Sequence, residues 1–355
     1  MTFPFPLPSR YELCAERLEG GQGFVYICID HFLQRKVAIK VVKHLSDINA
    51  LKKEMRTLSE VRSRHVAELY DLITAKRSGM CGLVEEYVGG PSLDEYIKTA
   101  DAGDYLRILW QLASGLSDIH VHGKIHRDIK PGNVRFDAEG VLKILDFGLA
   151  MDRKDAETIY SRGTKYFLAP ELYRTPPIKV KPAVDVYAFG VLAWYIGTGG
   201  KLHPAIRESP PASKTSMPSF ADIKSSLPAD LISLLDRTID VDPAVRPQML
   251  DLRLALERHI LYGKHRAHIA YGGDSRILST VGESATLRSG QDVITIIYNG
   301  LTFAIASVQG NVYVNNVRAV VGQPLPGSCV VTLGYGTGWS RVFVPIDMSH
   351  PGVVI

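Results

Sequence analysis

The sequence predicts an α+β domain followed by a small all-β domain, and three observations support this division. Composition changes near residue 265: residues 267–355 contain four arginines, four acidic residues and no lysine, so this segment carries no net charge. Upstream of it, strand-like and helix-like runs alternate, whereas downstream only short β-branched and aromatic runs occur. At 355 residues, of which 46% are apolar, the chain is long enough for two hydrophobic cores.

Composition also excludes several classes of protein. The net charge is only +4, without the large excess of basic residues that is typical of nucleic-acid-binding proteins, so we expect no nucleic-acid partner. The four cysteines (Cys14, Cys28, Cys81 and Cys329) stand far apart without metal-binding spacing, which is typical of reduced thiols. The proline-broken N-terminus does not resemble a signal peptide, and no apolar run reaches the roughly 18 residues of a membrane helix. We therefore expect a soluble, cytoplasmic protein without a membrane span.

The first strands carry a glycine-rich turn followed by a lysine. Residues 18–25 read Leu-Glu-Gly-Gly-Gln-Gly-Phe-Val, and the run Val-Ala-Ile-Lys ends at Lys40. Glycines at Gly20, Gly21 and Gly23 would let backbone amides approach phosphate groups where side chains would clash. This order therefore indicates a phosphate-binding hairpin.

A helix predicted over residues 49–62 offers a carboxylate partner for Lys40. Glu54 lies fourteen residues after the lysine and is the better candidate, while Glu60 is the alternative. A solvated helix charge is the competing interpretation of Glu54.

Two short motifs further along carry the chemistry. Residues 126–133 read His-Arg-Asp-Ile-Lys-Pro-Gly-Asn, and residues 146–148 read Asp-Phe-Gly. Phosphoryl transfer needs a carboxylate to orient the attacking hydroxyl and oxygen ligands to hold a cation against the phosphates. Asp128, Asn133 and Asp146 supply these groups in the order and spacing of the protein-kinase catalytic set.

On these motifs the chain resembles the eukaryotic-type (Hanks-type) Ser/Thr protein kinases, of the kind found in bacteria. The resemblance implies an α+β bilobal protein-kinase fold followed by a small all-β sandwich. It places an N-terminal extension at residues 1–9 and a kinase domain at 10–262, with the N-lobe at about 10–88 and the C-lobe at about 89–262. A linker at 263–269 and an all-β accessory domain at 270–355 would follow.

The resemblance also assigns roles to the motif residues. Asp128 would orient the substrate hydroxyl and accept its proton, and Lys130 would contact the γ-phosphate. Lys40, paired with Glu54, would reach the α- and β-phosphates of ATP. Asn133 and Asp146 would be the Mg²⁺ ligands, with Mn²⁺ as an alternative ion.

A larger set of residues would line the ATP pocket, with adenine bound through backbone groups of Glu86 and Val88. Two departures from the family pattern stand out, because Glu85 and Arg135 occupy positions that are usually apolar. Burying either charge alone would be costly, so we expect a polar pocket in which Lys40 or water holds Glu85. The complete predicted set is Leu18, Gly20, Gly21, Gly23, Val25, Ala38, Lys40, Glu85, Glu86, Val88 and Arg135.

The segment from Asp146 to Glu171 resembles an activation segment, ending in Ala-Pro-Glu. We expect the protein to phosphorylate itself there, at Thr158 or Ser161, with Tyr160 as a further candidate. The resemblance implies that Asp185 caps the backbone of the catalytic loop and that Arg246 pairs with Glu171. Both of these roles are structural.

The tail faintly resembles forkhead-associated (FHA) domains, which are β-sandwiches that bind phosphothreonine. No Gly-Arg pair followed by a Ser-x-x-His element is present, so a working phosphothreonine pocket is not expected. We expect regulation or partner binding, with one face on the kinase domain or on a second copy. Asn299 and Gly300 predict a two-residue hairpin turn. The predicted strands are Val293–Tyr298, Leu301–Ala306, Val312–Val314, Val317–Val321, Cys329–Leu333 and Arg341–Ile346.

Two other functions compete with an active kinase for protein substrates. A pseudokinase scaffold would bind nucleotide without turnover, but the five central residues of the catalytic set are all present. A small-molecule phosphotransferase is disfavoured by the complete Ala-Pro-Glu segment, which serves peptide substrates.

Overall fold

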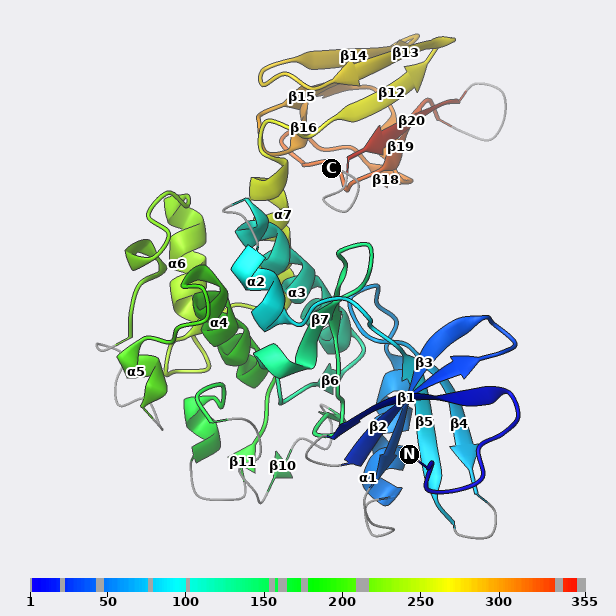
Figure 1. The fold of residues 1–355 in the computed structure, drawn as a ribbon. Helices are drawn as coiled ribbons and strands as arrows, with labels where there is room; N and C mark the ends of the chain where they lie inside the picture. The colour runs from blue at the N-terminus through cyan, green and yellow to red at the C-terminus, as the bar shows by residue number, and fades with distance from the viewer. Residues whose placement is uncertain are drawn as a thin grey trace. The chain divides into compact units, whose positions relative to one another are not determined.

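The computed structural model describes residues 2–19, 23–42, 48–75, 79–99, 103–152, 157–158, 165–173, 178–208, 217–335 and 341–349. The chain forms two compact units, residues 1–253 and residues 254–355. Figure 1 shows both units, with colour following the chain.

The first unit begins with a five-stranded antiparallel sheet in the order β1-β2-β3-β5-β4. Helix α1 (Ile48–Glu60) follows β3 in sequence and packs against β4 and β5. The helix was predicted over residues 49–62, so it begins one residue earlier and ends two residues earlier than expected. The strands are β1 (Tyr11–Glu19), β2 (Gly23–Asp30), β3 (Arg35–Val42), β4 (Leu69–Thr74) and β5 (Cys81–Glu86).

The N-terminal segment packs on this sheet. The ring of Phe3 lies 4.8 Å from those of Phe5 and Tyr26, measured between centroids. Phe5 is buried in the same apolar cluster as strand residues such as Val37 and Ile39. Burial of these rings removes apolar surface from water, so the segment contributes to the stability of the sheet.

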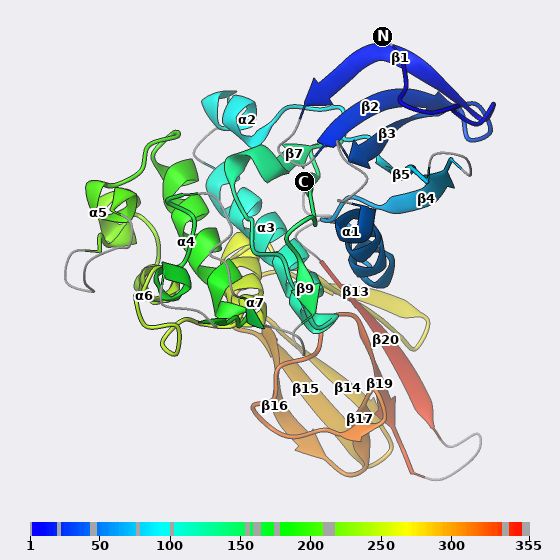
Figure 2. The same cartoon turned by 90° about the horizontal axis from the view of Figure 1, so that it is seen from below.

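The rest of the first unit is mainly helical. Helix α4 carries apolar residues around its whole circumference and is buried, as expected for a central helix. It packs against both α3 and α6, and Figure 2 shows these helices from below. The helices are α2 (Leu93–Thr99), α3 (Asp104–Val121), α4 (Ala183–Gly197), α5 (Pro204–Arg207) and α6 (Ala229–Thr238). The boundary between the two units falls within α7 (Met249–Leu261).

Short strands and 3₁₀ turns lie between α3 and α4 in sequence and carry the catalytic motifs. They pair as β6 with β9, β7 with β8, and β10 with β11. The strands are β6 (Lys124–Ile125), β7 (Val134–Phe136), β8 (Leu142–Ile144), β9 (Met151–Asp152), β10 (Glu157–Thr158) and β11 (Ile178–Lys179). The 3₁₀ turns are η2 (Pro131–Asn133) and η3 (Pro170–Tyr173), and η5 (Phe220–Asp222) follows α5.

The second unit consists of two sheets, so the predicted all-β region is confirmed as a sheet-rich unit. The larger sheet has the order β13-β12-β20-β19-β17-β18, the smaller one β14-β15-β16, and side chains from both form one apolar core. The strands are β12 (Ala267–Tyr271), β13 (Asp274–Leu278), β14 (Ser284–Ser289), β15 (Asp292–Tyr298), β16 (Phe303–Gln309), β17 (Val312–Val314), β18 (Val317–Arg318), β19 (Cys329–Leu333) and β20 (Val342–Met348).

Two details of this unit differ from the sequence prediction. Strand β12 begins at Ala267, inside the segment expected to be a linker. The two-residue hairpin was wrong, because Tyr298 pairs with Phe303 and four residues make the turn. The side chain of Asn299 explains the longer turn, since its Oδ1 accepts hydrogen bonds from the backbone N–H groups of Leu301 and Thr302.

Candidate active site

Three charged side chains from distant parts of the sequence meet in the first unit. The ammonium Nζ of Lys40 in β3 lies 2.6 Å from Oε1 of Glu54 in α1 and 2.6 Å from Oδ1 of Asp146. Lys40 and Glu54 are both buried. The alternative partner Glu60 does not take this place, because its Oε2 lies 2.6 Å from Nζ of Lys124.

The electrostatics of this cluster favour its charged form. Burial opposes a charge on Lys40, but the two carboxylates outweigh it and raise the pKa of the lysine above its ordinary value. Burial likewise opposes the charge on Asp146, yet the ammonium of Lys40 holds the pKa of that carboxyl below its ordinary value. The backbone N–H of Phe147 donates to Oε1 of Glu54 at 3.1 Å, which links α1 to the Asp-Phe-Gly motif.

Two residues of the catalytic motifs have an unusual backbone. Arg127 has a φ of 71° and Asp146 a φ of 62°, in the left-handed region that side chains disfavour. Such conformations persist where surrounding contacts enforce them. Oδ1 of Asp146 accepts from the N–H of Gly148 at 3.2 Å as well as from Lys40, so its carboxylate is fixed from two sides.

The catalytic loop brings Asp128, Lys130 and Asn133 together. Nζ of Lys130 lies 2.7 Å from Oδ2 of Asp128. The side-chain amide of Asn133 donates to the backbone oxygen of Asp128 at 2.8 Å and to its Oδ2 at 3.1 Å. The 3₁₀ turn η2 ends at Asn133 and reverses the chain, so the side-chain amide of Asn133 lies beside the carboxylate of Asp128.

A buried carboxylate of α4 binds the backbone of this loop. Asp185 accepts hydrogen bonds from the backbone N–H groups of His126 at 2.9 Å and Arg127 at 2.8 Å, as predicted. Nε2 of His120 donates to the same carboxylate at 2.8 Å. Burial by itself would raise the pKa of Asp185, but these donors hold it below its ordinary value.

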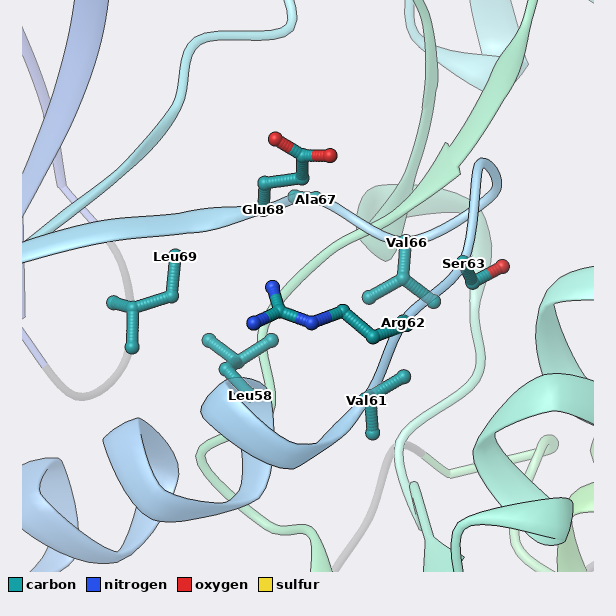
Figure 3. A pocket seen from close by; sticks show the side chains of 8 residues that line it. All are labelled: Leu58, Val61, Arg62, Ser63, Val66, Ala67, Glu68 and Leu69. Atoms are coloured by element: carbon teal, nitrogen blue, oxygen red, sulfur yellow. The ribbon is translucent and has the colours of Figure 1, made fainter.

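His126 and Phe147, which belong to the two catalytic motifs, are both buried. The rings of His126 and Phe147 meet edge to face, with centroids 4.7 Å apart. Leu58 in α1 is buried, and Leu69 begins β4. Figure 3 shows a small cavity between Leu58 and Leu69, with Arg62 extending beside them. Its volume of about 20 Å³ fits one water molecule, so it is no substrate site.

Glu85 lies at the end of β5 beside this cluster. It pairs with Ala38 of β3 in the sheet register. Its Oε1 is buried, and within the described residues no hydrogen bond reaches that atom. Burial, reinforced by the nearby carboxylate of Glu54, raises the pKa of Glu85 to about 8. The expected hydrogen bond from Lys40 is therefore not formed, since Lys40 is engaged by two other carboxylates.

Arg135 in β7 binds the connection that follows β5. Its Nε donates to the backbone oxygen of Val88 at 3.1 Å, and its Nη2 donates to that of Gly90 at 2.7 Å. Backbone carbonyls thus accept hydrogen bonds from the guanidinium. These bonds explain how a charged side chain fits at a position that is usually apolar. Glu86 is anchored beside it, because Nζ of Lys143 lies 2.9 Å from its carboxylate.

Not all predicted site residues belong to the described part of the chain. Gly20, Gly21, Tyr160 and Ser161 lie outside it, and only the backbone of Leu18 and Thr158 is described. Gly23 and Val25 are described in β2, where Val25 pairs with Lys40. A Cβ at Gly23 would lie 2.2 Å from the oxygen of Val41, so this position admits only glycine.

Asn133 and Asp146 are the residues that would hold a divalent cation, as the sequence predicts. Within the described residues, no group of three or more histidine, cysteine or acidic side chains is arranged around a metal site. The amide nitrogen of Asn133 is used inside the catalytic loop, which leaves its oxygen for a cation. Oxygen ligands are what Mg²⁺ prefers, so the side chains of these two residues fit the ion that the sequence predicts.

Sequence reasoning missed three contacts that support the site. The pairs Lys124–Glu60 and Lys143–Glu86 and the bonds from Arg135 to backbone oxygens had no motif to reveal them. Each joins residues far apart in sequence, so only the fold brings them together. By contrast, the pair between Arg246 and Glu171 was predicted and is bidentate, with both contacts at 2.8 Å.

Comparison with known proteins agrees with this geometry. A serine/threonine-protein kinase of Corynebacterium efficiens is 33% identical over 57% of this chain and 43% of its own length. A probable serine/threonine-protein kinase of Bifidobacterium longum is 32% identical over 54% of this chain and 27% of its own length. A serine/threonine-protein kinase of Myxococcus xanthus is 35% identical over 68% of this chain and 31% of its own length.

The chain thus spans less than half the length of these relatives. In the described part of this chain, none of the helices has the length and apolar character needed to span a bilayer. The match to the family described as "Protein kinase domain" covers residues 18–254, which is more than half of the sequence. The chain therefore belongs to the protein kinase family.

Proposed function

We propose that this chain is an active serine/threonine kinase that transfers the γ-phosphate of Mg-ATP to protein hydroxyl groups. The observation that carries the proposal is the contact of one ammonium with two carboxylates. Nζ of Lys40 reaches Glu54 and Asp146 at 2.6 Å each, and Glu54 also accepts from the N–H of Phe147. These bonds hold the helix, the lysine and the Asp-Phe-Gly motif in one arrangement.

The residues around Asp128 can orient a hydroxyl group. Asn133 and Lys130 both contact Oδ2 of Asp128, which fixes the orientation of the carboxylate. A carboxylate in this position accepts a hydrogen bond from the attacking hydroxyl and takes its proton late in the transfer. Lys130, which already lies beside Asp128, supplies positive charge for the transferred phosphoryl group.

Asn133 and Asp146 would hold the divalent cation. When bound, Mg²⁺ neutralises charge on the β- and γ-phosphates, with Mn²⁺ as a possible substitute. Lys40 contributes a fixed positive charge beside Asp146, where the α- and β-phosphates are expected. Because Glu54 also holds this lysine, the charge needs no reorganisation when the nucleotide arrives.

The resemblance to the kinase family implies serine and threonine substrates, because a lysine two residues after the catalytic carboxylate is typical of kinases that act on these hydroxyls. Lys130 holds that position and lies 2.7 Å from Asp128. The printed names of the bacterial relatives, which are serine/threonine kinases, support the same substrate class.

We extend the proposal to self-phosphorylation at Thr158, Ser161 or Tyr160 and to an FHA-like accessory unit. Support for the second point is the two-sheet arrangement of residues 267–348 around one core. Regulation or partner binding is its proposed role, by docking on the kinase domain or on a second copy. The cytoplasm is the proposed compartment.

A nucleotide-binding pseudokinase is the competing function, and one experiment separates the two. Purified full chain is incubated with radiolabelled ATP, Mg²⁺ and a generic protein substrate. Asp128→Asn should lower the rate by about 10²-fold or more, as expected for loss of a general base. Asp146→Asn should abolish use of Mg-ATP while leaving the fold intact.

The matched control is Asp251→Asn, which makes the same chemical change at an exposed position of α7. It should keep the wild-type rate. Incorporation that is equal in wild type and Asp128→Asn would contradict the proposal and favour the scaffold function. Phosphopeptide mapping of the same wild-type sample tests the three acceptor residues.

A further inference from the structure

The outer face of the larger sheet in the second unit is apolar in its middle. In β20, which Figure 2 shows beside β19, Val344 and Ile346 are buried in the core, so the residues that alternate with them face outward. The ring of Phe343 is 59% exposed, and Pro345 is exposed as well. Val330 of β19, which pairs with Pro345 in the sheet register, is 38% exposed. Three apolar side chains therefore lie together on a surface that water reaches.

Opposite charges stand at the two ends of this apolar surface. Arg341 precedes Phe343 by two residues, and its guanidinium carbon lies 5.6 Å from the centre of that ring. Asp347 follows Pro345 by two residues and is exposed, and its Oδ1 accepts a hydrogen bond from Oγ of Ser328 at 2.6 Å. The outward side chains of β20, here called the β20 row, are thus Arg341, Phe343, Pro345 and Asp347, spanning about 20 Å.

The β20 row is complementary to itself when one copy of the strand is reversed. Val344 stands midway between Arg341 and Asp347, and it also stands midway between Phe343 and Pro345. A two-fold axis that lies in the plane of contact and crosses β20 at Val344 would set two copies of the strand face to face and antiparallel. Each Arg341 then meets Asp347 of the other copy. Each Phe343 meets Pro345 in the same way.

We propose that this face is an interface between two copies of the chain, which pair through the β20 row around such an axis. A second copy is one of the two partners proposed above for this unit, so the inference rests on that part of the proposed function. Burial of the apolar middle stabilises the contact, and the charged ends select its direction. A parallel arrangement would place Arg341 against Arg341 and Asp347 against Asp347, which like-charge repulsion disfavours.

The end of the row that carries Asp347 has room for an incoming arginine. A cavity of about 480 Å³ is open there, and His268, Asp347 and Arg266 are among the residues that line it. Arg266 stands beyond the proposed pair, because its backbone bonds to Ser349, two residues after Asp347. The side chain of Arg341 from a second copy can therefore reach the carboxylate of Asp347 from the open side of the cavity.

The test uses two charge-reversed variants of the full-length chain, alone and mixed. Arg341→Glu brings acidic groups together at both ends of the contact, and Asp347→Lys brings basic groups together. Sedimentation equilibrium should show wild type as a dimer, and each variant alone should have a dissociation constant at least about tenfold higher. In an equal mixture, both ends of a mixed pair join opposite charges, so the affinity should return to near the wild-type value.

Two further variants serve as controls. Arg288→Glu makes the same charge change at an exposed position of β14, in the other sheet, and should leave the dimer intact. Phe343→Ala should weaken the dimer, because the apolar middle of the row loses its largest side chain.

Three results would overturn the inference. A wild type that remains monomeric would contradict docking on a second copy altogether. A dimer that both charge variants keep would rule out this face, while docking on a second copy would stand. No recovery in the mixture would rule out the antiparallel pairing. The radiolabelled-ATP assay on the same samples tests the catalytic assignment separately, because none of these variants changes a catalytic motif.

Discussion

Lys124 and Glu60 form an ion pair that connects the end of α1 to the strand before the catalytic loop. The two charged atoms lie 2.6 Å apart. The lysine side chain is only 4% exposed, whereas the glutamate side chain is 60% exposed. Lys124 also pairs in the sheet with Asp152, a few residues after the Asp-Phe-Gly motif. One residue thus touches the helix that carries Glu54 and the segment that follows Asp146.

Breaking this pair should weaken the fold modestly. Glu60→Gln is expected to lower the free energy of unfolding by about 1 kcal/mol, because the glutamate is largely in water and its charge is screened. The loss should shrink in high salt. Equilibrium urea unfolding at two salt concentrations measures it, with exposed Glu139→Gln as the control. A loss that does not depend on salt would contradict the ion-pair explanation.

Removing the carboxylate of Asp185 should affect both stability and turnover. Asp185→Ala leaves the N–H groups of His126 and Arg127 buried without acceptors, at a cost of about 3 kcal/mol. Turnover should fall as well, because Asp128 follows these residues directly. Asp185→Asn keeps one oxygen and should lose less of both. Urea unfolding and initial rates measure the two effects, and wild-type rates in Asp185→Ala would refute the positioning role.

Replacing Arg246 by lysine should break the bidentate ion pair with Glu171 and lower the stability of the fold. The guanidinium also donates to the backbone oxygens of Asp240 and Ala183 at 2.8 Å. Arg246→Lys cannot reproduce this planar set of donors, so we expect a loss of about 2–3 kcal/mol. A double-mutant cycle with Glu171→Gln should show strong coupling. Additive losses in that cycle would mean that the two residues act independently.

His65 should make the first unit less stable at acidic pH. Burial lowers the pKa of this histidine to about 4, and its Nδ1 lies 3.1 Å from the backbone oxygen of Leu142. The unfolded chain takes up a proton near pH 6.5, which the folded chain resists until about pH 4. Stability should therefore fall as the pH drops through this window, by about 3 kcal/mol in total.

The measurement for His65 is the difference between two pH profiles. Urea unfolding of wild type and of His65→Gln is followed from pH 7.5 to pH 4. The wild-type free energy of unfolding should decline more steeply, since glutamine does not titrate in this range. Parallel profiles would show that His65 does not control the acid response.

Local sequence signals predicted many elements of the fold. The helix that carries Glu54 and the strands β17 and β19 were found because apolar residues recur at helix or strand spacing. Strand β13 was missed because most of its residues are polar and little apolar alternation remains. In β13, four of the five residues are exposed, so the sequence there resembles a loop.

In the candidate site, some side-chain roles were predictable from the sequence and others were not. The chemical groups of Asp128, Asn133 and Asp146 were predicted from their order, because the chemistry fixes both residue type and spacing. The backbone partners of Arg135 were not predicted, and the hydrogen bond expected from Lys40 to Glu85 is not formed. Whether a buried charge is satisfied depends on which backbone oxygens and ammonium groups the fold places within about 3 Å of it.

The sequence by itself therefore determined the family, the identity of the chemical groups and the division into an α+β and an all-β part. Such signals are local, since each motif is contiguous or has fixed spacing along the chain. Only the tertiary structure decided that Lys40 bridges Glu54 and Asp146, that Arg135 binds backbone carbonyls and that no described residue donates a hydrogen bond to Oε1 of Glu85. Those outcomes depend on distances between segments far apart in the chain, which are set by packing.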